Sequence, residues 1–128
     1  MPQALIVDDS KVMREMVIAC LRAHEGLSFT HAGSGLEALE KLALQSFDVV
    51  VLDLNMPDIS GYEVIEFIRG QDKLRQLPIL VVTTRGDDGS RARALGAGAT
   101  SFLTKPFSPA ELLGEVRALI GARPGAHA

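Results

Sequence analysis

Residues 4–9 of the chain read Ala-Leu-Ile-Val-Asp-Asp, an apolar run that ends abruptly in two aspartates. A short, nearly unbroken apolar run of this kind is typical of a parallel strand that is buried on both faces. Two further runs of the same type follow at 49–52 and 79–82. The segments 28–32 and 101–104 are more polar and fit strands at the edges of a sheet. The sequence therefore predicts five strands, of which three are central.

Segments with a helical pattern lie between these strands. In the first of them an apolar face is expected from residues at i, i+3, i+4 and i+7, which are Met13, Met16, Val17 and Cys20. Three later helices each begin with a Ser followed three residues on by a Glu, which is the capping-box pattern. These pairs are Ser34 with Glu37, Ser60 with Glu63, and Ser108 with Glu111. The remaining helix is expected at 90–95, with Gly96 at its end.

The alternation of strands and helices predicts the fold class. It implies right-handed βαβ units and so an α/β fold with a parallel sheet. Placing the first, third and fourth strands in the centre agrees with the doubly wound order 2-1-3-4-5 of flavodoxin-like folds, here with five helices. The length of 128 residues fits one domain. We expect that domain to span residues 1–121 and a flexible tail or linker to occupy 122–128.

Composition excludes several classes of protein. The net charge of −3 argues against a nucleic-acid-binding surface, which is usually basic. No apolar run approaches the length of a membrane span, and the beginning of the chain lacks the features of a signal peptide. The single cysteine, Cys20, cannot form an internal disulfide. These features predict a cytoplasmic protein.

The polar residues at the ends of the strands carry the functional information. Asp8 and Asp9 follow the first strand, Asp53 follows the third, Thr83 ends the fourth and Lys105 follows the fifth. In an open α/β sheet, binding sites form outside the carboxyl ends of the strands, where the strand order reverses. We therefore expect the three aspartates to converge at that point, with Thr83 and Lys105 on the far side of it.

Three carboxylates in one place call for a cation. Two unit charges about 4 Å apart repel by about 4 kcal/mol at an effective dielectric constant near 20. Oxygen-only ligands suit Mg²⁺, and no His or Cys lies at a spacing that would suggest zinc. A carboxylate can attack phosphorus to form an acyl phosphate. Lys105 could then neutralise a phosphoryl oxygen, and the hydroxyl group of Thr83 could donate a hydrogen bond to another.

Each of these residues also has an ordinary structural explanation. Asp8 or Asp9 could cap the first helix, and Asp53 could be a turn residue. Thr83 could be a simple strand residue and Lys105 a solvated lysine. Independent structural roles would scatter such residues over both ends of the sheet, so their placement at one end favours a site.

The order of these motifs resembles the receiver domains of two-component response regulators over residues 3–121. The motifs are Asp8-Asp9, Asp53-Leu54-Asn55-Met56-Pro57, Gly61, Thr83-Thr84 and Lys105-Pro106-Phe107. The resemblance implies that Asp53 accepts a phosphoryl group from a histidine kinase or phosphotransfer protein. It also implies that Mg²⁺ is bound by Asp9 and Asp53 directly, by the backbone carbonyl of Asn55, and by Asp8 through water.

The resemblance further implies a conformational switch. After phosphorylation Thr83 turns toward the phosphoryl group and Phe102 moves inward, which changes the surface formed by the fourth helix, fifth strand and fifth helix for a downstream target protein. Many receivers have Tyr where this chain has Phe102, so the hydroxyl group is missing here. The bond between Lys105 and Pro106 is expected to be cis. Such a domain is a signalling switch and catalyses only its own phosphorylation and dephosphorylation.

Other functions stay open at this point. The stretch from Asp8 to Arg14 resembles stand-alone, chemotaxis-type (CheY-like) regulators, but a receiver from a longer regulator with a separate output domain is the alternative. A phosphatase of the haloacid-dehalogenase type would need Asp-x-Asp after the first strand, where this chain has Asp8-Asp9-Ser10. A flavodoxin-like flavin carrier is a further alternative, but Asp8 and Asp9 would repel the flavin phosphate.

Overall fold

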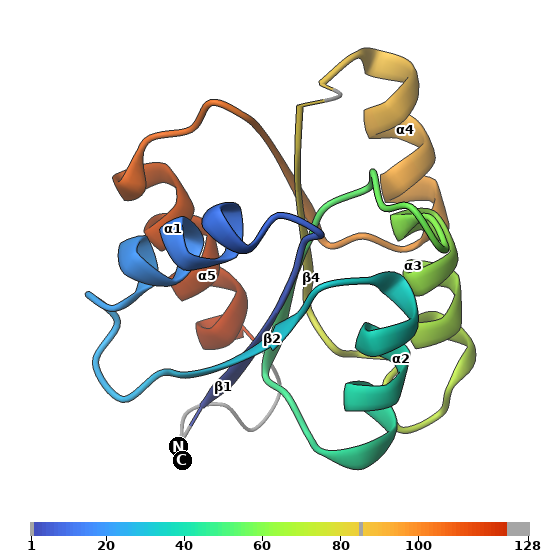
Figure 1. Cartoon of the computed structure of the whole chain (residues 1–128), viewed down its shortest axis with the longest axis horizontal. Helices are drawn as coiled ribbons and strands as arrows, with labels where there is room; N and C mark the ends of the chain where they lie inside the picture. The colour runs from blue at the N-terminus through green and yellow to red at the C-terminus, as the bar shows by residue number, and fades with distance from the viewer. Residues whose placement is uncertain (1, 85, 123–128) are drawn as a thin grey trace.

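The computed structural model describes residues 2–84 and 86–122, in which five strands alternate with five helices (Figure 1). The strands are β1 (Gln3–Val7), β2 (Ser28–Ala32), β3 (Val49–Leu52), β4 (Ile79–Thr83) and β5 (Ser101–Thr104). The helices are α1 (Lys11–Leu21), α2 (Gly35–Leu44), α3 (Gly61–Gly70), α4 (Asp88–Ala97) and α5 (Pro109–Ala122). All strand pairs are parallel, in the order β2-β1-β3-β4-β5. The predicted fold class and strand order are confirmed.

Helices cover both faces of the sheet. Helices α1 and α5 lie on one side, and α2, α3 and α4 lie on the other (Figure 1). Successive strand residues point to opposite faces, so β1 places Ala4 and Ile6 in the core under α1 and α5 and Leu5 and Val7 in the core under the other three helices. Every residue of β3 and β4 is buried, whereas β2 and β5 are partly exposed. The central runs are therefore apolar because their strands are buried on both faces, and the edge runs are more polar because their strands are partly exposed.

The buried face of α1 differs from the predicted one. Val17 is buried as expected, but Met16 is 43% exposed, and Ile18 and Leu21 are buried in its place. The helix has apolar residues around more than half of its circumference, so spacing alone allows two overlapping faces. Contact with α5 and the sheet selects the face that contains Ile18 and Leu21.

Helix α4 is longer than predicted, and the expectation that it ends at Gly96 was wrong. The helix continues through Gly96 to Ala97 and is capped by Gly98, which has φ 122°. A residue without a Cβ atom adopts this positive φ at low cost, so the chain leaves the helix at Gly98. At the other end the Asp87 carboxylate caps α4 by accepting the backbone N–H of Ser90.

The other helix starts show which polar residues have a structural role. Ser34, Ser60 and Ser108 each accept the backbone N–H of the residue three positions later, as the capping boxes predicted. Ser10 caps α1 by accepting the N–H of Met13. Neither Asp8 nor Asp9 is therefore the N-cap of α1, and both are left for other interactions.

The predicted tail at 122–128 falls, apart from residue 122, outside the described residues. Among the described helices, none has the length and apolar character needed to cross a bilayer.

Candidate functional site

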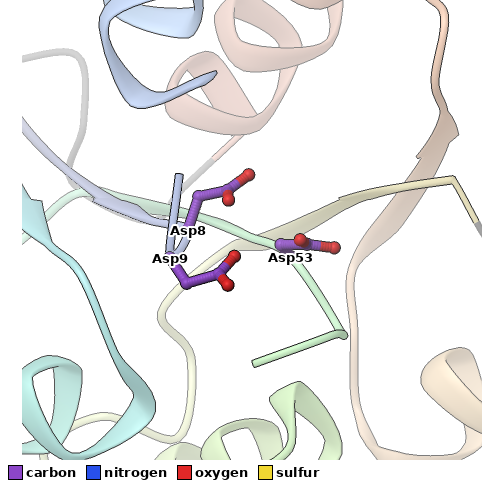
Figure 2. Close-up of side chains that lie close together, drawn as sticks. All are labelled: Asp8, Asp9 and Asp53. Carbon is purple, nitrogen blue, oxygen red and sulfur yellow. The ribbon is translucent and has the colours of Figure 1, made fainter. Parts of the chain in front are cut away.

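Three aspartates meet at the carboxyl ends of β1 and β3. Asp8, Asp9 and Asp53 each offer a carboxylate oxygen that lies within 4.8 Å of the other two (Figure 2). Val7 pairs with Leu52 at the last position of the two strands, so the next residues of both strands leave the sheet side by side. The backbone N–H of Asp53 donates to the carbonyl of Val7 across 3.0 Å. The predicted convergence of the three aspartates is present.

The environment of Asp53 disfavours its charged form. The residue is only 8% exposed, and burial is the main reason that its carboxyl pKa is raised from 3.8. The nearby charge of Asp8 raises this pKa further. The positive charge of Lys105 and hydrogen bonds from the Asn55 backbone and the Thr83 side chain lower it, but only partly offset the other two effects.

Lys105 and Thr83 complete the site from β5 and β4. The ammonium nitrogen of Lys105 lies 3.1 Å from a carboxylate oxygen of Asp8 and 3.7 Å from one of Asp53. Thr83 is fully buried, and its side chain hydrogen-bonds Asp53. All five residues that sequence analysis placed at this edge are therefore in one cluster.

The donor set of this cluster fits Mg²⁺. Three carboxylates face a single ammonium group, so a divalent cation would balance the excess negative charge. The available donors are all oxygens, which suits a hard cation that keeps several water ligands. Asn55 lies two residues after Asp53 and donates its backbone N–H to the Asp53 carboxylate across 3.4 Å. The role of its carbonyl group as a ligand stays a prediction.

Gly61 approaches the site too closely for any side chain. A Cβ atom at this position would lie 2.7 Å from the carbonyl oxygen of Asp53 and 2.7 Å from the Cα of Leu54. The N–H of Gly61 donates to the carbonyl of Leu54 across 3.0 Å. The start of α3 therefore packs directly on the backbone that carries Asp53.

The expected switch residues lie beside the cluster. Phe102, on β5, is 7% exposed, and the guanidinium group of Arg91 on α4 lies over its ring at 5.7 Å. Phe102 pairs with Val81, two positions before Thr83 on the neighbouring strand. The bond between Lys105 and Pro106 is cis, as the resemblance implied.

Sequence reasoning missed two residues that support the site. Asp58 follows β3 and accepts the backbone N–H groups of Gly35 and Leu36 across 3.0 and 2.8 Å, and bonds to backbone N–H groups lower its pKa to about 2. Arg14, on α1, donates to the carbonyl of Asp8. No local pattern connects Asp58 with a helix start 22 or 23 positions earlier in the chain. Arg14 had a local signal, since it lies on the helix that directly follows Asp8 and Asp9.

Comparisons with known proteins agree with this geometry. The profile of the response regulator receiver domain family matches residues 4–117. The transcriptional regulatory protein TcrX of Mycobacterium tuberculosis is 40% identical over 116 residues, which cover 91% of this chain and 48% of TcrX. The chain thus spans about half the length of the curated relatives it matches.

Solved structures show the same fold. The chemotaxis protein CheY4 of Vibrio cholerae matches with a TM-score of 0.86 and 36% identity, covering 93% of this chain and 98% of CheY4. The receiver domain of the sensor histidine kinase PA1611 from Pseudomonas aeruginosa matches with a TM-score of 0.86 and 31% identity, covering 94% of this chain and 98% of that domain. Its structure has a magnesium ion coordinated in the active-site cleft. By sequence profile, fold and acidic phosphoacceptor site, this chain belongs to the response regulator receiver domain family.

Proposed function

We propose that the chain is a phosphorylation switch in which Asp53 accepts a phosphoryl group from a histidine kinase or a phosphotransfer protein. Mg²⁺ would be held by Asp9 and Asp53, by the carbonyl of Asn55, and by Asp8 through water. The observation that carries this proposal is the convergence of three carboxylates with the ammonium group of Lys105 at one edge of the sheet. Receiver domains act in signalling and are not enzymes, so the outcome is a change of state in the protein itself.

The chemistry of the transfer follows from the positions of the side chains. A carboxylate oxygen of Asp53 forms a bond to phosphorus as the bond between phosphorus and the donor imidazole nitrogen breaks, and the imidazole keeps the electron pair. When bound, Mg²⁺ supplies charge neutralisation and orients the phosphoryl oxygens. Lys105 neutralises one phosphoryl oxygen, and the hydroxyl group of Thr83 donates to another. The chain contributes mainly position and charge, as phosphoryl transfer requires.

The same residues connect the site to a surface. Thr83 ends β4, Phe102 lies on β5, and Pro106 follows Lys105. We propose that phosphorylation reorganises these three residues and so changes the face formed by α4, β5 and α5, to which a downstream protein binds. The ring of Phe102 is already buried and lies 5.7 Å from the guanidinium group of Arg91 on α4, so this contact is one that the reorganisation would change.

The protein context allows two versions of this function. We propose a stand-alone regulator, supported by the match to nearly the whole of CheY4 and by the stretch from Asp8 to Arg14. The alternative is a receiver in a longer regulator with an output domain, which the half-length match to TcrX favours. The intact mass of the native protein, isolated from its own cells, distinguishes the two: a mass near 13.7 kDa supports the stand-alone form.

Phosphorylation with a small-molecule donor tests the site. In the presence of acetyl phosphate and Mg²⁺, we expect the protein to gain one acid- and base-labile phosphoryl group, detected by intact mass spectrometry. Asp53→Asn should abolish the gain, as should EDTA. Asp72→Asn is the matched control, because Asp72 is exposed and lies in the loop after α3. A label that persists in Asp53→Asn would show that the phosphoacceptor is a different residue.

A further inference from the structure

Asp8 is held firmly, whereas Asp9 is not. The N–H of Asp8 donates to the carbonyl of Ala32, and its carboxylate accepts the N–H of Ser10 and a hydrogen bond from Lys105. Asp9 is exposed and, within the described part of the chain, makes no side-chain hydrogen bond or ion pair. The direction of the Asp9 carboxylate therefore depends on the backbone from which it projects.

Arg14 fixes that backbone. Its Nη1 donates to the carbonyl oxygen of Asp8 across 2.6 Å. This oxygen belongs to the peptide group that joins Asp8 to Asp9, so the bond sets the plane of that peptide. The bond is charge-assisted, which makes it stronger than a bond between neutral groups.

His31 on β2 orients the guanidinium group of Arg14. The Nε of Arg14 donates to the Nδ1 of His31 across 3.0 Å. The planar guanidinium group has its donors in a rigid arrangement, so two bonds to separate acceptors define its position. Arg14 thus links β2, α1 and the peptide between the two acidic residues.

The partners of Arg14 are unusual for a cation that contacts the backbone of an acidic pair. Such a cation ordinarily forms an ion pair, as Lys105 does here. Arg14 forms no ion pair with any described carboxylate and instead bonds to a backbone carbonyl and an imidazole nitrogen. Its contacts fit the placement of a ligand better than the neutralisation of charge.

We propose that Arg14 is a positioning residue of the Mg²⁺ site. Held by His31, it fixes the peptide between Asp8 and Asp9 and thereby directs the Asp9 carboxylate toward the ion. This inference rests on the proposed function, since it assumes that Asp9 is a Mg²⁺ ligand. Residues that orient metal ligands typically contribute about 10- to 100-fold to metal affinity.

The sign of the effect separates positioning from simple electrostatics. Removal of a positive charge from beside the peptide that joins Asp8 to Asp9 should by itself strengthen the binding of a cation there. Loss of positioning should weaken it. Arg14→Gln removes both the charge and the guanidinium donors, so weaker Mg²⁺ binding by a folded variant supports lost positioning and is the opposite of the electrostatic effect.

Isothermal titration calorimetry of the whole unphosphorylated chain with MgCl₂ tests the proposal. We expect Arg14→Gln to weaken Mg²⁺ binding roughly tenfold. Arg14→Lys should also weaken it, because a point charge cannot make both bonds, and His31→Ala should weaken it less. Arg22→Gln is the matched control: Arg22 follows the same helix at its far end and lies over Phe29, and its loss should leave the Mg²⁺ affinity unchanged.

Urea unfolding without Mg²⁺ measures the free energy of unfolding of each variant. A purely structural role of Arg14 predicts a lower free energy of unfolding with no change in Mg²⁺ affinity. Arg14→Gln and Arg14→Lys that bind Mg²⁺ as tightly as the wild type, or more tightly, would overturn the proposal. If Arg14→Gln does not fold, Arg14→Lys and His31→Ala decide the question.

Asp9→Asn distinguishes a failure of the positioning role from a failure of the proposed function. If the wild type binds Mg²⁺ and Asp9→Asn does not, unchanged binding in the Arg14 variants refutes only the positioning role. If the wild type itself binds no Mg²⁺, the proposed function is refuted.

Discussion

The ammonium nitrogen of Lys105 lies 3.1 Å from a carboxylate oxygen of Asp8, although 97 positions separate the two residues in the chain. The contact joins the carboxyl ends of β1 and β5, which are separated in the sheet by β3 and β4. Lys105 reaches across both strands and also approaches Asp53. Lys105 therefore contacts two of the three carboxylates that converge at this edge of the sheet.

Lys105→Gln should separate metal binding from switching. We expect Mg²⁺ binding to be largely retained, because an ammonium group is not a metal ligand and its positive charge opposes a cation. The phosphorylated state should no longer produce the full conformational change, because one phosphoryl oxygen loses its charged partner. Calorimetric Mg²⁺ titration and NMR spectra with and without acetyl phosphate measure the two effects. Lys73→Gln is the control, because Lys73 is exposed and lies in the loop after α3. A loss of Mg²⁺ affinity alone in Lys105→Gln would contradict a role of Lys105 in switching.

Asp53→Asn should stabilise the protein at neutral pH in Mg²⁺-free buffer. Burial raises the pKa of Asp53 above 3.8, so the folded state binds the proton more tightly than the unfolded chain. The contribution of protonated Asp53 to the stability of the folded state is fully present below pH about 4. It is lost as the pH rises through the higher pKa that Asp53 has in the folded state. Asparagine carries no charge, so the variant should be more stable than the wild type at pH 7, and the difference should be small near pH 3. Urea unfolding of both proteins across this range measures the gain, and a variant that is less stable at pH 7 would contradict the pKa argument.

Asp58→Asn should weaken the link between the loop after β3 and the start of α2. The Asp58 carboxylate accepts two backbone N–H groups at that helix start, and its pKa is lowered to about 2. Its stabilising effect is present above the unfolded pKa of 3.8 and is lost as the pH falls toward 2. The wild type should therefore have the higher melting temperature at pH 7, and the difference should shrink below pH 4. Glu66→Gln on the exposed face of α3 is the control, and a pH-independent difference would exclude ionised Asp58 as the cause.

Gly61→Ala should damage both stability and phosphorylation. The new methyl group would lie 2.7 Å from the Asp53 carbonyl oxygen, so the backbone that carries Asp53 would have to move. Overpacking of this kind typically costs roughly 1 to 3 kcal/mol of unfolding free energy. Gly70→Ala at the other end of α3 is the matched control, because nothing lies within 4 Å of its added methyl group. Equal unfolding free energies for the two variants would show that the close approach at Gly61 is unimportant.

Much of the site could be anticipated because it follows strand ends. Asp8, Asp9, Asp53, Thr83 and Lys105 each come at or directly after a recognisable strand, and parallel strands bring those ends to one edge. The resemblance to receiver domains added the roles, the cis bond and the switch residue Phe102. The stretch at 90–95 belongs to a helix with few apolar residues, so its sequence pattern does not mark where the helix ends.

The order of apolar and polar runs along the chain was sufficient to define five strands, the helices between them and the edge where the carboxylates gather. These features could be predicted because apolar runs and side-chain periodicity are local properties of the sequence. Contacts between distant segments depended on the folded structure. The burial of Ile18 and Leu21 in place of Met16 depends on the packing of α1 against α5. The bonds from Asp58 to the start of α2 and from Arg14 to Asp8 depend on the positions of whole helices on the sheet. Such contacts depend on how elements meet in space, and no spacing along a single element encodes that.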